Sequence, residues 1–302
     1  MRTTLNQRTL ALLALLGGVV ILGFAAIFVK WSGAPGQVTA LYRMLIASAA
    51  ITPVYLLRRR SASTSLPGRG VLMAVLGGTL FGCDMAIWMT AIGISGATMP
   101  TLAANTAPLW VGIGSIVIFR ERKAPGFWTG VLIAIAGVVL VLGHNIRTTD
   151  GLAAGMIMGL IAALFYASFQ LATQAGRRRI DTVSFLWIST MSAAGALLII
   201  NIIMRSPLSG FSMKTYIAFI ALGLLVQFLG WLLIHFSQGY LRASIVAPVL
   251  LAQPVLTALL AVPLLGERFT FWHIAGGTAV LAGVYIVIWG RNRVLSLEGE
   301  NE

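Results

Sequence analysis

Charge is scarce in this sequence, and acidic charge is scarcest. Charged residues make up 10% of the 302 residues, with only 8 Asp and Glu against 21 Lys and Arg. Hydrophobic residues make up 58%, and the mean hydropathy is +0.93. A soluble domain of this length needs more charge to cover its surface. We therefore expect lipid to surround most of the chain.

The sequence also lacks the residues that several kinds of site require. Its single cysteine, Cys83, lies in an apolar run, so neither an internal disulfide nor a thiolate cluster is expected. The formal net charge of +13 does not indicate nucleic-acid binding, because the basic residues lie in short connectors between long apolar runs. We expect no cofactor, no metal and no nucleic-acid partner.

Long apolar segments fill the space between these connectors, and their backbone groups must be paired internally, which favours helices. The first segment follows Arg2 and Arg8 as in a signal peptide, but at about twenty residues it is long enough to cross ~30 Å of hydrocarbon. Ten transmembrane helices are predicted, at residues 10–30, 36–57, 70–93, 97–119, 127–144, 152–176, 182–204, 215–238, 242–264 and 272–290.

The basic residues predict the orientation of these helices. With ten spans, 15 of the 21 basic residues fall on one side of the membrane and 5 on the other, and Arg43 lies within a span. Cytoplasmic connectors carry the excess of Lys and Arg. The chain is therefore expected in a bacterial inner membrane, as a multi-pass protein with both termini in the cytoplasm and the lipid bilayer as a partner.

The two halves of the chain repeat each other. A shift of 146 positions places Pro108 on Pro254 and Glu121-Arg122 on Glu267-Arg268, and several glycines also coincide. We expect a first repeat at 1–146 and a second repeat at 147–302 that ends in a short cytoplasmic tail. Five spans per repeat is an odd number, so the second repeat must cross the membrane inverted. Secondary transporters bind substrate between such repeats, near the bilayer midplane.

The stretch from Ala97 through Asn105 and Pro108 to Glu121-Arg122 resembles the EamA domain of the drug/metabolite transporter superfamily, as does its repeat from Ala243 through Pro254 to Glu267-Arg268. Arg43 also stands where these domains commonly carry an arginine. One departure is Arg120, which replaces the more usual glycine before Glu121. The resemblance implies ten helices around a central cavity and often the export of amino acids or other metabolites.

Two charges are expected deep in the bundle. Asp84 is the only acidic residue deep within a span, and a charge there is costly unless it is paired or hydrated. At 1.5 Å per residue, Asp84 and Arg43 fall at a similar depth, in the outer half of the membrane. An Asp84–Arg43 ion pair is therefore predicted. Its role is either purely structural or the binding of substrate or of a coupled proton.

Polar and aromatic residues at helical spacing suggest further site residues. Such side chains seldom face lipid, because their amide and imidazole groups need partners, although contact between helices is an equally good explanation. For Trp88, one turn beyond Asp84, an aromatic anchor at the membrane interface is the alternative. The candidates are Trp88, Thr101, Asn105, Tyr166, Gln170, Gln227, Trp231, His235 and Gln253.

The function expected is secondary transport or facilitated diffusion of a small solute, most of all an amino acid, by a monomer or weak homodimer, with protons as a candidate coupling ion. A drug or other metabolite exporter of the same superfamily is the alternative. A membrane-embedded enzyme is a distant one, because the sequence has no His-Glu-x-x-His motif, no paired intramembrane aspartates and no nucleophile elbow.

The predicted orientation can be tested by cysteine labelling. Cysteines placed at Ser63 and Ser296 should react with a membrane-impermeant reagent only from the cytoplasm, and one at Ser209 only from outside. Labelling of Ser63 and Ser209 from the same side would refute the inverted repeat.

Overall fold

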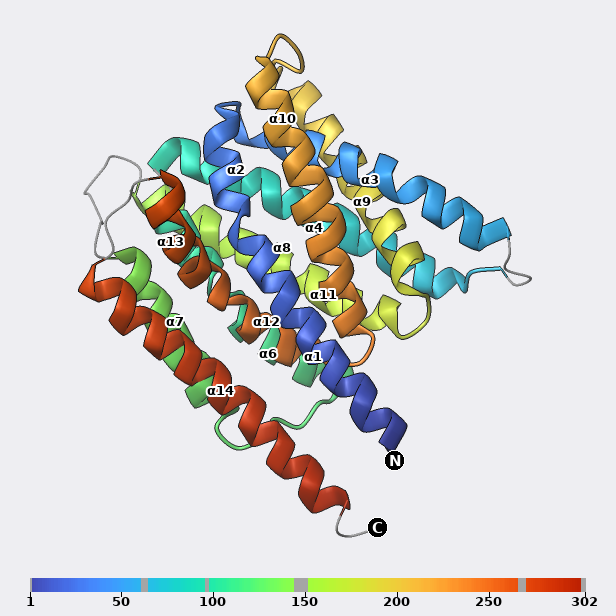
Figure 1. Ribbon diagram of the computed structural model, residues 1–302, viewed down its shortest axis with the longest axis vertical. Coiled ribbons are helices and arrows are strands. Elements are labelled where there is room, and N and C mark those ends of the chain that lie inside the picture. The colour runs from blue at the N-terminus through green and yellow to red at the C-terminus, as the bar shows by residue number, and fades with distance from the viewer. Residues whose placement is uncertain (1, 61–64, 96–97, 144–151, 266–269, 300–302) are drawn as a thin grey trace.

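The computed structural model describes residues 2–60, 65–95, 98–143, 152–265 and 270–299, and the described part is helical (Figure 1). The helices are α1 (Arg2–Gly23), α2 (Ala25–Ser32), α3 (Gly36–Arg60), α4 (Gly68–Ser95), α5 (Thr98–Ala104), α6 (Ala107–Phe119), α7 (Phe127–Gly143), α8 (Leu152–Arg177), α9 (Thr182–Ile203), α10 (Met213–Ala221), the π-helix η1 (Leu222–Gly230), α11 (Trp231–Gln238), α12 (Ala243–Leu250), α13 (Ala252–Leu265) and α14 (Phe271–Gly299).

These helices confirm the expected polytopic membrane fold. Within the described residues, nine helices, some built from two or three consecutive segments, are long and apolar enough to cross a bilayer. The helix at the fifth predicted span, α7, is shorter, at 17 residues. Successive spans alternate in direction, so α3 and α8 end at the same end of the bundle, at Arg60 and Arg177. We call this the arginine-rich end.

Two spans are interrupted at equivalent places. The fourth span breaks between Ala104 and Ala107, and the ninth breaks at Leu251, where α12 gives way to α13. The 146-residue shift carries Asn105 onto Leu251. Each break lies a few residues before the repeated proline, which has no N–H to donate and opens the hydrogen-bond ladder one turn earlier. The sequence repeat is therefore also a repeat of helix geometry.

Helices α7 and α14 lie along each other at one edge of the bundle (Figure 1). A Cβ added to Gly130 would lie 2.7 Å from the carbonyl oxygen of Gly283, and one added to Gly137 would lie 2.6 Å from that of Gly276. The 146-residue shift maps Gly130 onto Gly276 and Gly137 onto Gly283. The two contacts are thus one contact seen twice, as two inverted repeats facing each other require.

The centre of the bundle is formed by α4, which packs against both α8 and α9. Glycines make this approach possible: a Cβ at Gly82 would lie 2.9 Å from the carbonyl oxygen of Ala193. Helix α3 packs on α9 and on η1. These contacts place the deep residues of α3, α4, α8 and η1 next to one another, where the candidate site lies.

The glycine contact between α7 and α14 predicts a stability effect. Gly137→Ala should destabilise the protein by about 2 kcal/mol, because its methyl group meets rigid backbone of α14 and overpacking of this kind costs 1–3 kcal/mol. Gly195→Ala on α9 is the matched control, because a Cβ there meets nothing within 4 Å. Thermal unfolding in detergent measures both. Equal effects of the two substitutions would contradict the close contact.

Candidate functional site

Arg43 on α3 is buried in the centre of the bundle and bonds to the second repeat. It is 7% exposed, and its Nε donates to Oε1 of Gln227 at 2.9 Å. Gln227 lies in the π-helix η1 and is 2% exposed. The neighbouring Gly223 lets η1 approach α3, since a Cβ there would lie 2.6 Å from Cβ of Ile46. π-Helical turns inside longer helices are frequent at functional sites.

Asp84 on α4 is equally buried but makes no such bond. It is 8% exposed and, among the described residues, forms neither a hydrogen bond nor an ion pair. The expected Asp84–Arg43 ion pair is therefore wrong for this conformation. The Nε of Arg43 donates to Gln227 instead. The Tyr166 side chain lies close enough to interact electrostatically with both Arg43 and Asp84. We refer to Arg43 and Asp84 as the central charges.

A chain of hydrogen bonds starts beside the central charges. Gln170 Nε2 donates to the Tyr166 hydroxyl at 3.0 Å, and Gln238 Nε2 donates to Gln170 Oε1. Gln238 Oε1 lies 3.3 Å from Nδ1 of His235. This chain joins α8 to α11 and satisfies the two buried glutamines and the imidazole. The candidates Tyr166 and Gln170 on α8 and His235 on α11 thus lie on helix faces that meet inside the bundle.

Aromatic rings pack beside this chain. Phe81 of α4 stacks on Phe169 of α8 with centroids 4.6 Å apart, and Trp231 lies 5.0 Å from Phe81. The indole N–H groups of Trp88 and Trp231 are buried without a hydrogen-bond partner in the described part of the chain. A buried donor without a partner is costly. The centre therefore holds spare donors as well as apolar surface.

The remaining predicted residues lie at the helix breaks. Asn105 separates α5 from α6, and its Nδ2 donates to the carbonyl oxygen of Thr101 at 2.7 Å. Gln253 begins α13 and is half-buried. Within the described residues, no hydrogen bond or ion pair joins Thr101, Asn105 or Gln253 to the central charges. They stay predictions.

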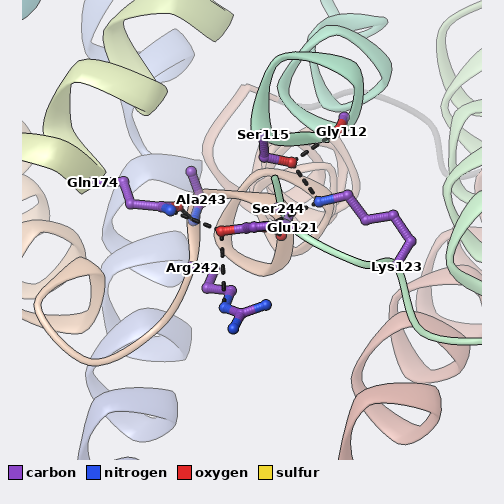
Figure 2. Close-up of polar contacts among 8 residues, drawn as sticks. All are labelled: Gly112, Ser115, Glu121, Lys123, Gln174, Arg242, Ala243 and Ser244. Atoms are coloured by element: carbon purple, nitrogen blue, oxygen red, sulfur yellow. Dashed lines mark hydrogen bonds and ion pairs between the residues drawn. The ribbon is translucent and has the colours of Figure 1, made fainter. Parts of the chain in front are cut away.

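A second polar cluster, which the sequence did not indicate, lies at the arginine-rich end and is centred on Glu121 (Figure 2). Glu121 is 7% exposed. Its carboxylate accepts from Gln174 Nε2 at 2.8 Å, from Ser244 Oγ at 3.0 Å and from Lys123 Nζ at 3.0 Å, while Arg242 Nε lies 3.8 Å away. We call these five residues the Glu121 cluster.

The Glu121 cluster joins the two repeats. Glu121 follows α6 in the first repeat, whereas Gln174 is on α8 and Ser244 is in the first turn of α12. The oxygen of the Gln174 side chain also accepts from the backbone N–H of Ala243. A carboxylate at the start of α12 is favoured by the positive end of the helix dipole. Only the repeated Glu-Arg pair could have drawn attention to this residue from the sequence.

The backbone of Arg120 has a conformation that favours glycine. This residue ends α6 with φ +52°, in the left-handed region that glycine adopts without strain. The turn allows the N–H of Glu121 to donate to the carbonyl oxygen of Ser115 at 3.2 Å. The turn that places Glu121 is the reason for a glycine at this position, and this chain makes it with an arginine.

The electrostatics of the cluster keep Glu121 ionised. Burial alone would raise the pKa of its carboxyl group, but hydrogen bonds from Gln174, Lys123 and Ser244 and the charge of Lys123 outweigh burial, so the pKa lies below its ordinary value. Burial lowers the pKa of Lys123, and the nearby carboxylate opposes that shift. The cluster is a buried Glu121–Lys123 ion pair, with the half-exposed Arg242 beside it and with Gln174 and Ser244 as neutral donors to the carboxylate.

The fold and the site together define a polytopic helical membrane protein with two broken-helix repeats and charged side chains at its centre. The sequence signature of the EamA-like transporter family matches residues 9–143 and 153–289. The chain belongs to this family, with one copy of the signature in each repeat.

Curated relatives share modest identity with the chain. It is 26% identical over 265 residues to a "Probable amino-acid metabolite efflux pump" of Salmonella typhimurium, covering 85% of this chain and 86% of that one. It is 24% identical to an "Uncharacterized transporter YcbK" of Bacillus subtilis, covering 91% and 90%. With an "Uncharacterized transporter" of Archaeoglobus fulgidus, 27% identity extends over 62% of this chain and 66% of that relative.

A solved crystal structure has the same fold. It superposes with a TM-score of 0.79 at 18% sequence identity and covers 93% of this chain and 98% of that one. At this identity the likeness extends to the helical architecture alone.

The Glu121 cluster predicts a pH-dependent stability. Glu121→Gln should cost about 3 kcal/mol at neutral pH, because it leaves the buried ammonium of Lys123 without a counter-charge. A carboxylate with a lowered folded-state pKa contributes stability above its ordinary pKa and loses it as the pH falls through the lowered value. The advantage of the wild type should thus hold down to about pH 5 and shrink below about pH 4.

Thermal unfolding in detergent across this pH range measures the difference. The double variant Glu121→Gln/Lys123→Met serves as the control and should recover part of the loss, since neither charge is left alone. A difference that does not change with pH would show that the carboxylate charge contributes nothing.

Proposed function

We propose that this chain is a secondary transporter that exports amino acids or related zwitterionic metabolites across the bacterial inner membrane by alternating access. One observation carries the proposal: the guanidinium of Arg43 and the carboxyl group of Asp84 are both buried in the bundle, and within the described residues they form no ion pair with each other. An unpaired charge inside a membrane bundle marks a functional site by default. The Salmonella relative, whose printed name includes amino-acid metabolite efflux, supports the substrate class.

A zwitterion supplies what both charges lack. Its carboxylate suits the terminal nitrogens of Arg43, because Gln227 occupies only Nε and guanidinium groups bind carboxylates through two nitrogens. Its ammonium group suits Asp84. The Tyr166 hydroxyl already accepts from Gln170 and so keeps its own proton for donation. The rings of Phe81 and Trp231 offer an apolar surface for the substrate side chain.

The Glu121 cluster provides the closure that alternating access requires. A carrier must block one end of its path while the other is open, and the contact that blocks it must break and re-form. The cluster joins α6 and α8 to the start of α12 across the two repeats. We propose that it closes the arginine-rich end, which we assign to the cytoplasm from its basic residues. The equivalent Glu267-Arg268 lies outside the described residues.

Transport by purified protein in proteoliposomes tests the proposal. Arg43→Gln and Asp84→Asn should each reduce exchange of a labelled amino acid by about 30-fold or more, the effect of losing one charge-assisted bond to the substrate. Arg69→Gln, at an exposed arginine of the arginine-rich end, is the matched control and should leave exchange unchanged. Wild-type protein that moves no amino acid from a complete pool would refute the proposal.

Substrate analogues separate binding from folding defects. The wild type should discriminate against the deaminated acid and the decarboxylated amine, whereas Asp84→Asn should lose discrimination against the acid alone. A folding defect lowers all rates together. Repeating the assay with a pH gradient tests a coupled proton on Asp84, because its neutral substitute would then exchange substrate but no longer respond to the gradient.

A further inference from the structure

A groove of about 750 Å³ opens at the arginine-rich end, apart from the central charges and the Glu121 cluster. It lies where four spans meet their ends: α3 ends at Arg60, α8 at Arg177, α11 at Gln238, and α9 begins at Thr182. In a membrane, this is the level of the lipid headgroups.

The groove carries an excess of positive charge. Four of its lining residues are arginines, Arg58 and Arg177 to Arg179, against the single carboxylate of Asp181. That carboxylate caps α9 by accepting from the backbone N–H groups of Val183 at 3.0 Å and Ser184 at 3.1 Å. Burial would raise the pKa of Asp181, but hydrogen bonds from Ser184 and Val183 and the charge of Arg177 lower it.

The four arginines are not equally engaged. Arg177 is fully used, since it donates to the carbonyl oxygens of His235 and Ile180 and to the Thr182 hydroxyl. The Arg178 guanidinium lies over the Phe119 ring, 5.4 Å from its centroid. Arg179 is exposed, and Arg58, with 63% of its side chain exposed, only reaches Asp181 at 4.0 Å. Two guanidinium groups are therefore available to an anion.

One wall of the groove is apolar. Leu232 and Phe236 of α11 line it. On the same stretch of chain, Leu229 and Leu225 precede them at spacings of three and four residues and are 42% and 47% exposed. At these spacings the four side chains follow one face of the helix, from exposed leucines to the groove lining, and we call them the apolar stripe.

We propose that this groove binds an anionic phospholipid, with its phosphate between Arg58 and Arg179 and an acyl chain along the stripe. Basic pockets between transmembrane helices bind anionic headgroups, and each arginine near the headgroup contributes about 1 kcal/mol. A free phosphate ion would use the arginines but not the stripe. The inference does not depend on what the central charges bind.

Native mass spectrometry and thermal shift with phosphatidylglycerol, phosphatidylcholine and inorganic phosphate test the proposal. Phosphatidylglycerol alone should remain bound and raise the unfolding temperature. Arg58→Gln/Arg179→Gln should weaken its binding about 25-fold, from about fivefold for each arginine. Arg60→Gln/Arg69→Gln removes the same charge from the same end outside the groove lining and should leave binding unchanged.

A third variant tests the apolar wall. Phe236→Ala should weaken the binding of phosphatidylglycerol but leave any response to inorganic phosphate unchanged. If the Arg58→Gln/Arg179→Gln variant does not fold, Arg179→Gln alone takes its place. The proposal is overturned if the control pair weakens binding as much as the groove pair, if inorganic phosphate matches the lipid, or if phosphatidylcholine binds equally well.

Discussion

Hydrocarbon offers no hydrogen-bond partners, so a polar group within a span must find its partner inside the protein. This constraint organises the bundle. Arg43 is held by Gln227, and Gln170 by Tyr166 and Gln238, in each case across two helices or along one buried face. Each bond fixes the rotation of a helix that apolar packing alone would leave loosely specified. Within the described residues, Asp84 stands out as an ionisable side chain that is buried without such a bond.

The two repeats share their helix geometry but contribute different residues to the centre of the bundle. Both have a broken helix at the same position, and they meet through the paired glycines of α7 and α14. The central charges nevertheless belong to the first repeat alone: the 146-residue shift carries Arg43 onto Ser189 and Asp84 onto Gly230. The second repeat supplies the neutral partners, Gln227 among them. A symmetric scaffold thus carries an asymmetric centre, which suits a substrate with two different ends.

The sequence predicted the features that depend on long runs of residues, namely the spans and their buried faces. The predicted spans lie within a few residues of the observed helices, because twenty apolar residues have no other stable form in lipid. The burial of Gln227, Trp231 and His235 followed from their spacing, since such groups avoid lipid. The repeated prolines marked equivalent positions of the two halves, and the structure breaks a helix a few residues before each of them.

The sequence did not predict the contacts that depend on distances between helices, because residue periodicity carries no information about those distances. Asp84 and Arg43 share a depth, but equal depth says nothing of the angle between two side chains around the bundle axis. Arg43 bonds to Gln227 of the π-helix η1, a partner that no periodicity in the sequence indicates. Gln174 and Ser244 contact Glu121 from 53 and 123 residues away, and neither stands out in a stretch of ordinary composition.

One face of α8 connects the two polar regions. Tyr166, Gln170 and Gln174 follow one another at intervals of four residues and so line the same side of the helix. Tyr166 lies within reach of the central charges, and Gln170 belongs to the hydrogen-bond chain that ends at His235. Gln174 holds Glu121 and the start of α12.

In the proposed site, a substrate that bonds to the Tyr166 hydroxyl contacts the same helix that carries Gln174. A small rotation of α8 would misalign the bonds that join Gln170 to Gln238 and Gln174 to Glu121 and Ala243. Interhelical contacts of this kind switch between discrete arrangements. In the proposed transport cycle, occupation of the centre and release of the Glu121 cluster are therefore two consequences of one helix movement. The coupling needs no separate relay, because the stripe of three side chains on α8 is itself the connection.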